Sequence, residues 1–140
     1  MSVTAIMTDF KYITINSNDD RIQTFFDQYL NDIEFFFPDF DIEEISFAEI
    51  ELMIIDDQLC GILIYQDKGE EMHIELDYVI KEFRNLGIGQ SYIPYLFYQF
   101  KKAGYKEVYA KTGNERHKLY LNTLGFNSSK SHPDLLEQKL

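Results

Sequence analysis

Two neighbouring stretches of the sequence carry residue types that can do chemistry. The first is Arg84-Asn-Leu-Gly-Ile-Gly89, which follows an apolar stretch and opens an amphipathic one. A strand that enters a helix through such a turn leaves backbone N–H groups unpaired at the helix N-terminus. Glycines at 87 and 89 let a ligand approach those amides without a side chain in the way. Together with the helix dipole, the amides predict a site for an anion, most naturally a phosphate.

The second stretch lies just upstream, where His73, Glu75 and Asp77 alternate with apolar residues. On a strand, this alternation predicts that the three titratable side chains share one face and that the apolar ones share the other. A carboxylate or an imidazole there can take a proton from an ammonium group, directly or through water. We rank Glu75 first as the general base, His73 second, and Asp77 as a helper or an anchor for a cation. A polar, solvated sheet face is the structural alternative, and for His73 alone a structural role is favoured.

The elements that must position these residues form an α/β pattern. Helices are predicted at 22–33, from Gly87 to Ala103, and from a cap at Asn114 through Leu124. Strands are predicted at 11–15, 47–55, 59–65, 71–80, 106–111 and 135–140. Short turns make the middle three strands an antiparallel meander. The expected order is β-α-β-β-β-α-β-α-β, a mixed sheet with helices on both faces.

Composition indicates a single globular domain over residues 1–140, with 45% apolar residues. We find no apolar run of the roughly 20 residues that a membrane helix needs and no signal-peptide pattern, so we expect a cytoplasmic protein without a membrane partner. Cys60 is the only cysteine, which excludes an internal disulfide and a Cys-based zinc site, and we expect no metal. Its place in an apolar run predicts a buried, inert thiol.

Charge is divided unevenly along the chain. Residues 1–80 contain 19 acidic and 3 basic side chains, whereas residues 81–140 contain 5 acidic and 10 basic ones. The overall charge of −11 argues against a nucleic-acid partner. A basic half suits an anionic cofactor and an acidic half suits a cationic substrate. Simple solubility is an equally weighted explanation for the acidic half.

Two motifs resemble those of the GNAT N-acetyltransferase superfamily. The stretch Val79-Ile-Lys-Glu-Phe-Arg-Asn-Leu-Gly-Ile-Gly89 is similar to the family's acyl-CoA motif, a strand followed by R/Q-x-x-G-x-G/A. The stretch from Asn114 to Phe126 is similar to the second motif, an asparagine, a helix and then Gly-Phe. Because the element order is also that of the family, the resemblance covers nearly the whole chain. It implies a GNAT-like acyl-CoA N-acyltransferase fold, an α/β mixed sheet with a splayed parallel strand pair.

The resemblance further implies an enzyme that transfers an acetyl group from acetyl-CoA to a primary amine by direct attack in a ternary complex. Pantetheine would pair with the backbone of Val79 and Ile80, between strands 71–80 and 106–111, where N–H groups near Val79 would polarise the thioester carbonyl. The charge pattern favours a cationic amine acceptor. The implied cofactor contacts also include Arg84, Asn85, Leu86, Gly87, Ile88, Gly89, Gln90, Asn114, His117 and Lys118.

One departure from the family pattern concerns the general acid. Many members carry a tyrosine four residues before the Gly of Gly-Phe, where it protonates the leaving thiolate, and this chain has Leu121 there. Tyr120 is one residue earlier, about 100° around the helix, and reaches the thiol only if the helix is rotated or shifted. Otherwise the thiolate leaves unassisted or takes a proton from water. We expect His117 and Lys118 to add positive charge near the cofactor.

Three other interpretations stay open at this point. A non-catalytic acyl-CoA-binding or regulatory module is the main alternative. An unrelated α/β interaction protein could use the aromatic segment 35–40 as its interface, although such a segment is more often core under a loop. A dinucleotide fold is disfavoured because Tyr92 replaces the third glycine of G-x-G-x-x-G. Exposed sheet edges are compatible with a homodimer.

Overall fold

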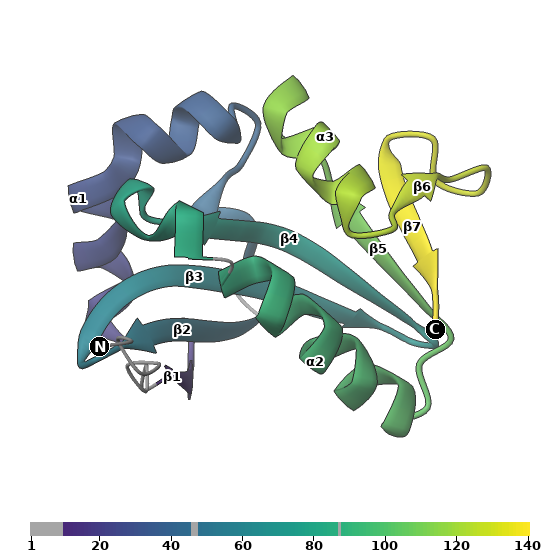
Figure 1. The fold of residues 1–140 in the computed structure, drawn as a ribbon, viewed down its shortest axis with the longest axis horizontal. Helices are drawn as coiled ribbons and strands as arrows, with labels where there is room; N and C mark the ends of the chain where they lie inside the picture. The colour runs from purple at the N-terminus through teal and green to yellow at the C-terminus, as the bar shows by residue number, and fades with distance from the viewer. Residues whose placement is uncertain (1–9, 46–47, 87) are drawn as a thin grey trace, which may run out of the picture.

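The computed structural model describes residues 10–45, 48–86 and 88–140. These residues form a seven-stranded mixed sheet in the order β1-β2-β3-β4-β5-β7-β6 (Figure 1). Only β4 and β5 pair in parallel among the described strands. The strands are β1 Phe10–Ile15, β2 Glu49–Ile55, β3 Gln58–Lys68, β4 Glu71–Val79, β5 Glu107–Lys111, β6 Asn127–Ser128 and β7 Leu135–Lys139. The predicted mixed sheet is confirmed, and the two-residue β6 is an addition to it.

Three α-helices connect the strands, and local signals set their ends. They are α1 Asp20–Phe36, α2 Ile88–Lys102 and α3 Glu115–Thr123; two short 3₁₀ helices are η1 Ile42–Ile45 and η2 Lys81–Leu86. The side chains of Asp19 and Asn114 cap α1 and α3 by accepting from Arg21 N and His117 N. Gly104 and Gly125 follow α2 and α3 with φ values of 98° and 99°, as helix-ending glycines do. No helix of the described residues is long and apolar enough to cross a membrane.

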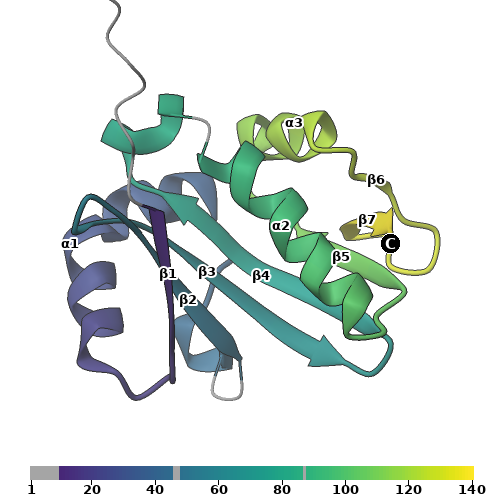
Figure 2. The ribbon, with the colours of Figure 1, turned by 60° about the horizontal axis from the view of Figure 1, so that its bottom comes forward.

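The helices cover opposite faces of the sheet (Figure 2). On one face, α1 packs its buried side chains Ile22, Phe25, Phe26 and Ile33 against β2, β3 and the end of β4. On the other face, α2 and α3 share a second core with β3, β5 and β7. Cys60 lies in this second core, where burial raises the pKa of its thiol to about 11. The expectation of a buried cysteine is confirmed, and the raised pKa is consistent with an inert thiol.

The aromatic segment 35–40 belongs mostly to the core at the end of α1. Phe37 is buried, and Phe40 stacks against Phe26 with ring centroids 5.6 Å apart. Phe36 packs under the Arg84 guanidinium at 4.5 Å. Phe35 is the exposed aromatic residue of the segment, so the proposal that the segment is an aromatic interaction surface loses its basis.

Candidate active site

The parallel strands β4 and β5 lie together at one end and separate towards the other (Figure 1). Their pairing covers Glu71–Ile74 of β4 and Glu107–Ala110 of β5. Beyond Ile74, β4 continues to Val79 with β3 as its neighbour on one side and no pairing to β5 on the other. A splayed strand of this kind offers backbone groups to a ligand that can pair like a strand.

Val79 presents its backbone to this divergence. Ile80 N donates to Cys60 O at 2.8 Å, so in the antiparallel ladder the polar groups of Val79 point away from β3. The Val79 carbonyl accepts from Arg84 Nε at 2.9 Å. Both backbone groups of Ile80 are bonded within the protein, because its carbonyl accepts from Phe83 N. The backbone groups of Val79 therefore point towards the divergence, whereas those of Ile80 are already used within the protein.

A β-bulge in β4 corrects the predicted arrangement of the titratable residues. Ile64 pairs with Leu76 and Tyr65 pairs with Ile74, which leaves Glu75 as the extra residue. Met72 and Ile74 pack in the core beneath α2, whereas Leu76 and Tyr78 pack in the core beneath α1. The prediction of one apolar and one titratable face is thus wrong. The bulge places His73 and Asp77 on opposite faces of the sheet.

Glu75 directly follows Ile74, the last residue of β4 that pairs with β5. Its Oε2 is 2.8 Å from Lys111 Nζ, and its side chain is 11% exposed against 50% for the lysine. The ion pair holds the Glu75 carboxylate at the point where β4 and β5 begin to separate. This is a place from which it can accept a proton from an incoming group.

Asp77 is held by a histidine of α3. Its Oδ1 lies 2.7 Å from His117 Nε2; the histidine side chain is buried and that of Asp77 is 10% exposed. Gly113 N–H donates to His117 Nδ1 at 2.9 Å, so Nδ1 accepts and Nε2 carries the proton donated to Asp77. This is the neutral form of the ring. The expectation of a positively charged His117 beside the cofactor is therefore wrong, because the ring is buried and uncharged in this bonding pattern.

The junction of α1 and α3 fixes this pair. Asn114 N donates to Phe36 O at 2.7 Å and Asn114 Nδ2 donates to Phe35 O at 3.2 Å. A Cβ at Gly113 would lie 1.9 Å from Phe36 O, so the close approach needs glycine. The side chain of Asn114 serves the cap and this junction, and Lys118 is exposed one turn along α3.

Tyr120 is half-buried on α3, and Leu121 beside it is in the core beneath α2. Burial, and then the charge of Asp77, raise the pKa of the Tyr120 hydroxyl above its ordinary value. The hydroxyl is therefore protonated at neutral pH but gives up its proton reluctantly. The two rings of His117 and Tyr120 lie 6.3 Å apart between centroids.

The turn at residues 84–89, which the sequence predicts to bind an anion, consists of the end of η2 and the start of α2. The first N–H groups of an α-helix have no partner within it, so at the start of α2 we expect those of Ile88, Gly89 and Gln90 to be the groups that could bind an anion. Gly87 lies outside the described residues, and so do the side chains of residues 85–91, including Asn85 and Leu86. The predicted contacts of these side chains stay predictions.

Arg84, in η2, turns its side chain away from this turn. It pairs with Asp32 of α1, and Asp32 also accepts from Tyr78 OH at 2.5 Å. Burial alone would raise the pKa of Asp32, but the bonds from Tyr78 and Arg84 outweigh it and lower that pKa. The Arg84 side chain thus ties η2 and the end of β4 to α1.

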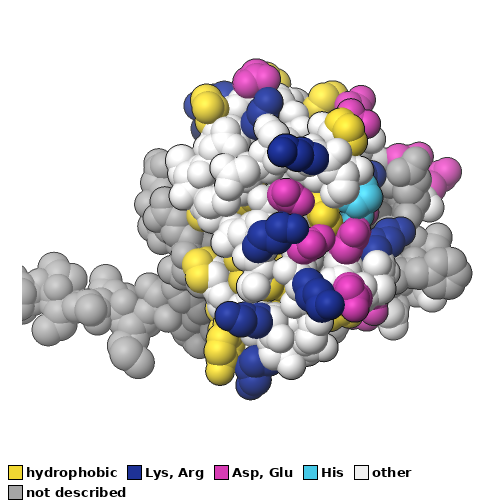
Figure 3. Space-filling view, turned by 90° about the vertical axis from the view of Figure 1, so that its right-hand side faces the viewer, with side chains coloured by type: hydrophobic (Ala, Val, Ile, Leu, Met, Phe, Trp, Pro, Cys, Tyr) yellow, Lys and Arg dark blue, Asp and Glu magenta, His cyan; other side chains and the backbone are white. Residues whose placement is uncertain are grey.

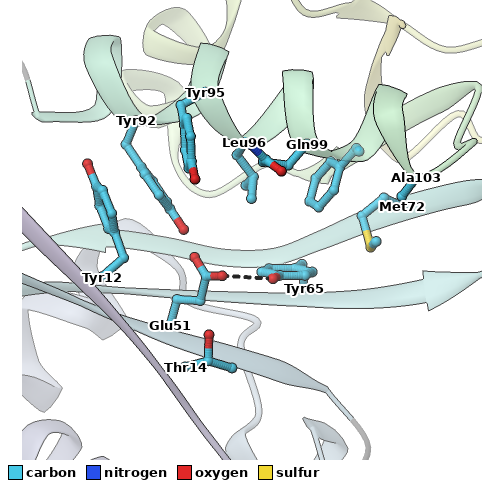
Figure 4. Close-up of a pocket in the computed structure, with 11 residues that line it drawn as sticks. Tyr12, Thr14, Glu51, Tyr65, Met72, Tyr92, Tyr95, Leu96, Gln99 and Ala103 are labelled. Atoms are coloured by element: carbon cyan, nitrogen blue, oxygen red, sulfur yellow. Dashed lines mark hydrogen bonds between the residues drawn. The ribbon is translucent and has the colours of Figure 1, made fainter.

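A separate pocket of about 510 Å³ lies between α2 and the strands β1 to β4 (Figure 4). Glu51 is the charged residue of its lining and accepts from Tyr65 OH at 3.0 Å. The buried Tyr92 hydroxyl has no hydrogen-bond partner among the described residues. Tyr12 stacks on Tyr92 with centroids 3.9 Å apart. Sequence reasoning missed this pocket, for which the alternation of Glu49, Ile50 and Glu51 was the one available signal.

We predict that Glu51→Gln stabilises the protein at high pH. Burial raises the pKa of Glu51 above its unfolded value, so stability falls as the pH rises above the unfolded pKa, and the full cost of the charged carboxylate is present above the folded pKa. Glutamine keeps an acceptor for Tyr65 and carries no charge. Thermal unfolding should show a Tm higher by roughly 2 to 4 °C at pH 8, and the difference should vanish near pH 4. Glu34→Gln, at an exposed site on α1, is the control; a less stable Glu51→Gln protein at pH 8 would contradict the prediction.

The fold and the divergent strand pair define a class of protein, the acyl-CoA-dependent acyltransferases. A model of the acetyltransferase (GNAT) family matches residues 14–126, and the chain belongs to that family. No curated protein matches the sequence.

Solved structures of the family share the fold at low sequence identity. An acetyltransferase of the GNAT family from Staphylococcus aureus Mu50 superposes with a TM-score of 0.72 at 15% identity, over 94% of this chain and 99% of that one. The PaiA N-acetyltransferase from Thermoplasma acidophilum, in complex with coenzyme A, gives 0.68 at 11% identity, over 94% and 99%. A GNAT family acetyltransferase from Elizabethkingia anophelis with acetyl-CoA bound gives 0.62 at 19%, over 94% and 98%.

Proposed function

We propose that the protein transfers an acetyl group from acetyl-CoA to a primary amine of a cationic acceptor. The observation that carries this proposal is the divergence of β4 from β5 after Ile74, with the Val79 backbone facing it and the start of α2 following. Pantetheine would lie in the divergence and pair with Val79. The pyrophosphate would lie on the amides from Arg84 to Gln90, where the helix dipole favours an anion.

In this proposal the amine attacks the thioester directly. Glu75 would accept the ammonium proton, directly or through water, and Asp77 would help to hold the cationic acceptor. The Val79 N–H would stabilise charge that develops on the carbonyl oxygen. His73 loses its place as a candidate base, because the bulge places it on the face opposite Asp77.

The thiolate would leave with a proton from water rather than from a side chain. Leu121 occupies the position where a tyrosine would reach the thiol, and the raised pKa of Tyr120 makes its hydroxyl a poor acid. The acidic half of the chain supports a cationic acceptor, such as a polyamine, an aminoglycoside-like compound or a lysine side chain. A cytoplasmic location and a homodimer stay predictions.

Binding of acetyl-CoA is the first test. We expect about 1 mM acetyl-CoA to raise the Tm by several degrees, since a ligand at 100 times its Kd stabilises the native state by about 2.7 kcal/mol. Thiol release should then follow with at least one cationic amine. The absence of any Tm change would contradict the proposal.

A non-catalytic acyl-CoA-binding module is the second candidate. The missing tyrosine at Leu121 favours it, because no side chain at that position could protonate a leaving thiolate. This candidate predicts the same rise in Tm with acetyl-CoA but no thiol release above the rate of buffer across the amine panel. The two measurements together therefore separate enzyme from binder.

A further inference from the structure

Three metal-ligating side chains meet where β4 still pairs with β5, before the divergence. They are Glu71 and His73 of β4 and His132 of the connection between β6 and β7, and their ligand atoms all lie within 4.8 Å of one another. Glu71 Oε2 is 2.9 Å from His73 Nε2 and 3.2 Å from His132 Nε2. Figure 3 shows a histidine side chain beside acidic and basic ones on the side of the molecule that faces right in Figure 1.

The surrounding residues hold this arrangement in place. The Tyr109 ring packs against both histidines, at 5.2 Å from His73 and 4.6 Å from His132 between centroids. Its hydroxyl donates to Glu107 Oε2 at 2.8 Å. The buried Ser129 hydroxyl accepts from His132 N at 3.0 Å, which fixes the connection that carries this histidine. The three ligands are therefore placed by the fold and not by a flexible loop alone.

The geometry fits a four-coordinate dication with an open position. Two histidines and one glutamate are a ligand set of catalytic zinc sites, with Zn–N and Zn–O distances of about 2.0–2.2 Å. Tetrahedral bonds of that length separate neighbouring ligand atoms by about 3.4 Å, so each Glu71–histidine distance needs to open by only a few tenths of an ångström. Glu71 and His132 are about one-third exposed, which leaves room for water as the fourth ligand.

The local charge also suits a cation. Glu107 and Glu137 lie beside the cluster through their contacts with Tyr109 and Ser129, and Lys139 pairs with Glu107 at 2.9 Å. The alternative without a metal is a hydrogen-bonded triad in which the Glu71 carboxylate accepts from both Nε2–H groups. The two alternatives differ in what added metal should do: a metal site should bind it with a defined stoichiometry, whereas the hydrogen-bonded triad should not bind it.

We propose that Glu71, His73 and His132 bind a first-row transition-metal dication, for which Zn²⁺ is the best fit, and that the bound metal ties the β6–β7 connection to β4. Few features of the sequence indicate this site, since only the Glu71-x-His73 pair is local and His132 lies far along the chain. A metal site here would be contrary to the expectation from the sequence that the protein binds no metal. It is independent of the acetyltransferase proposal, because the cluster lies outside the divergence.

The test is metal binding by the full-length, untagged, metal-stripped protein. We expect one equivalent of Co²⁺ to give the visible absorption bands of a four-coordinate site, and Zn²⁺ to displace it. Zn²⁺ should also raise the Tm, because it binds the folded state. His132→Ala should weaken Co²⁺ binding by at least about 100-fold, as loss of one of three ligands does. Circular dichroism checks that the variant folds.

Asp134→Asn, in the same connection but outside the ligand set, is the matched control and should bind Co²⁺ as the wild type does. A second ligand variant, Glu71→Gln, should lose binding to the same extent as His132→Ala. The proposal is overturned by the absence of saturable binding below about 100 µM Co²⁺. It is also overturned by binding that persists in both ligand variants, which would mean an adventitious ion only.

Discussion

Glu75→Gln should lower kcat for thiol release by about 100- to 1,000-fold, the usual contribution of a positioned general base. Glutamine has nearly the same shape, and its amide oxygen can still accept from Lys111 Nζ, so the ion-pair site keeps its geometry. The amide cannot take a proton from the attacking ammonium. The KM for acetyl-CoA should stay within a few-fold of wild type, because Glu75 is placed to meet the amine and not the cofactor. Initial rates of thiol release at saturating amine measure the effect.

Glu70→Gln is the matched control for this change. Glu70 is in the turn before β4, exposed and paired with Lys106 at 3.5 Å, and the substitution removes the same charge away from the divergence. Its kcat should equal that of the wild type. Asp77→Asn separates the two carboxylates: we expect a higher KM for the amine with a smaller loss of kcat. If Asp77→Asn loses more kcat than Glu75→Gln does, Asp77 is the base and our assignment is wrong.

The elements around the site could be predicted because their signals are local. The cap at Asn114, the glycines that end α2 and α3, and the helical spacing from Ile22 to Ile33 each act over a few residues. Short turns then fix the antiparallel meander. The resemblance of two motifs to the GNAT superfamily gave the parallel pair and its divergence, which no local signal contains.

The arrangement of the titratable residues could not be predicted, because it depends on pairing between strands. The bulge at Glu75 arises where Ile64 and Tyr65 of β3 pair with residues two apart on β4. On each side of the bulge, successive side chains alternate between the two faces of the sheet. Across the bulge the apolar side chains change from one face to the other. The same limit applies to His117, whose charge state follows from a bond to Gly113 and an approach to Asp77 from another element.

Arg84 shows how a motif residue can acquire a second structural role. The spacing to Gly87 and Gly89 predicts that Arg84 takes part in an anion-binding turn. Its side chain nevertheless pairs with Asp32, which lies more than fifty residues earlier on α1. Such a partner comes from the packing of α1 on the sheet. The anion-binding proposal therefore rests on backbone groups, and its test has to act on the backbone turn.

Gly89→Asp should abolish the stabilisation by acetyl-CoA while leaving the free protein intact. Position 89 is in the first turn of α2, where a carboxylate interacts favourably with the helix dipole, so the unliganded Tm should stay the same or rise slightly. Against a bound phosphate the carboxylate is repulsive. Two unit charges about 4 Å apart at an effective dielectric constant of 20 repel by roughly 4 kcal/mol, which corresponds to an increase in Kd of about 1,000-fold.

The contrast between free and liganded protein makes this variant informative, since a misfolded protein would lose stability in both states. Tyr98→Asp adds the same charge to an exposed position on the opposite side of α2, within reach of Lys102, and should keep the acetyl-CoA shift. Calorimetric titration of both variants with acetyl-CoA gives the Kd values. An unchanged Kd for Gly89→Asp would place the pyrophosphate elsewhere. In that case the start of α2 would not be part of the cofactor site. The role of Glu75 would still be tested separately by the turnover measurements.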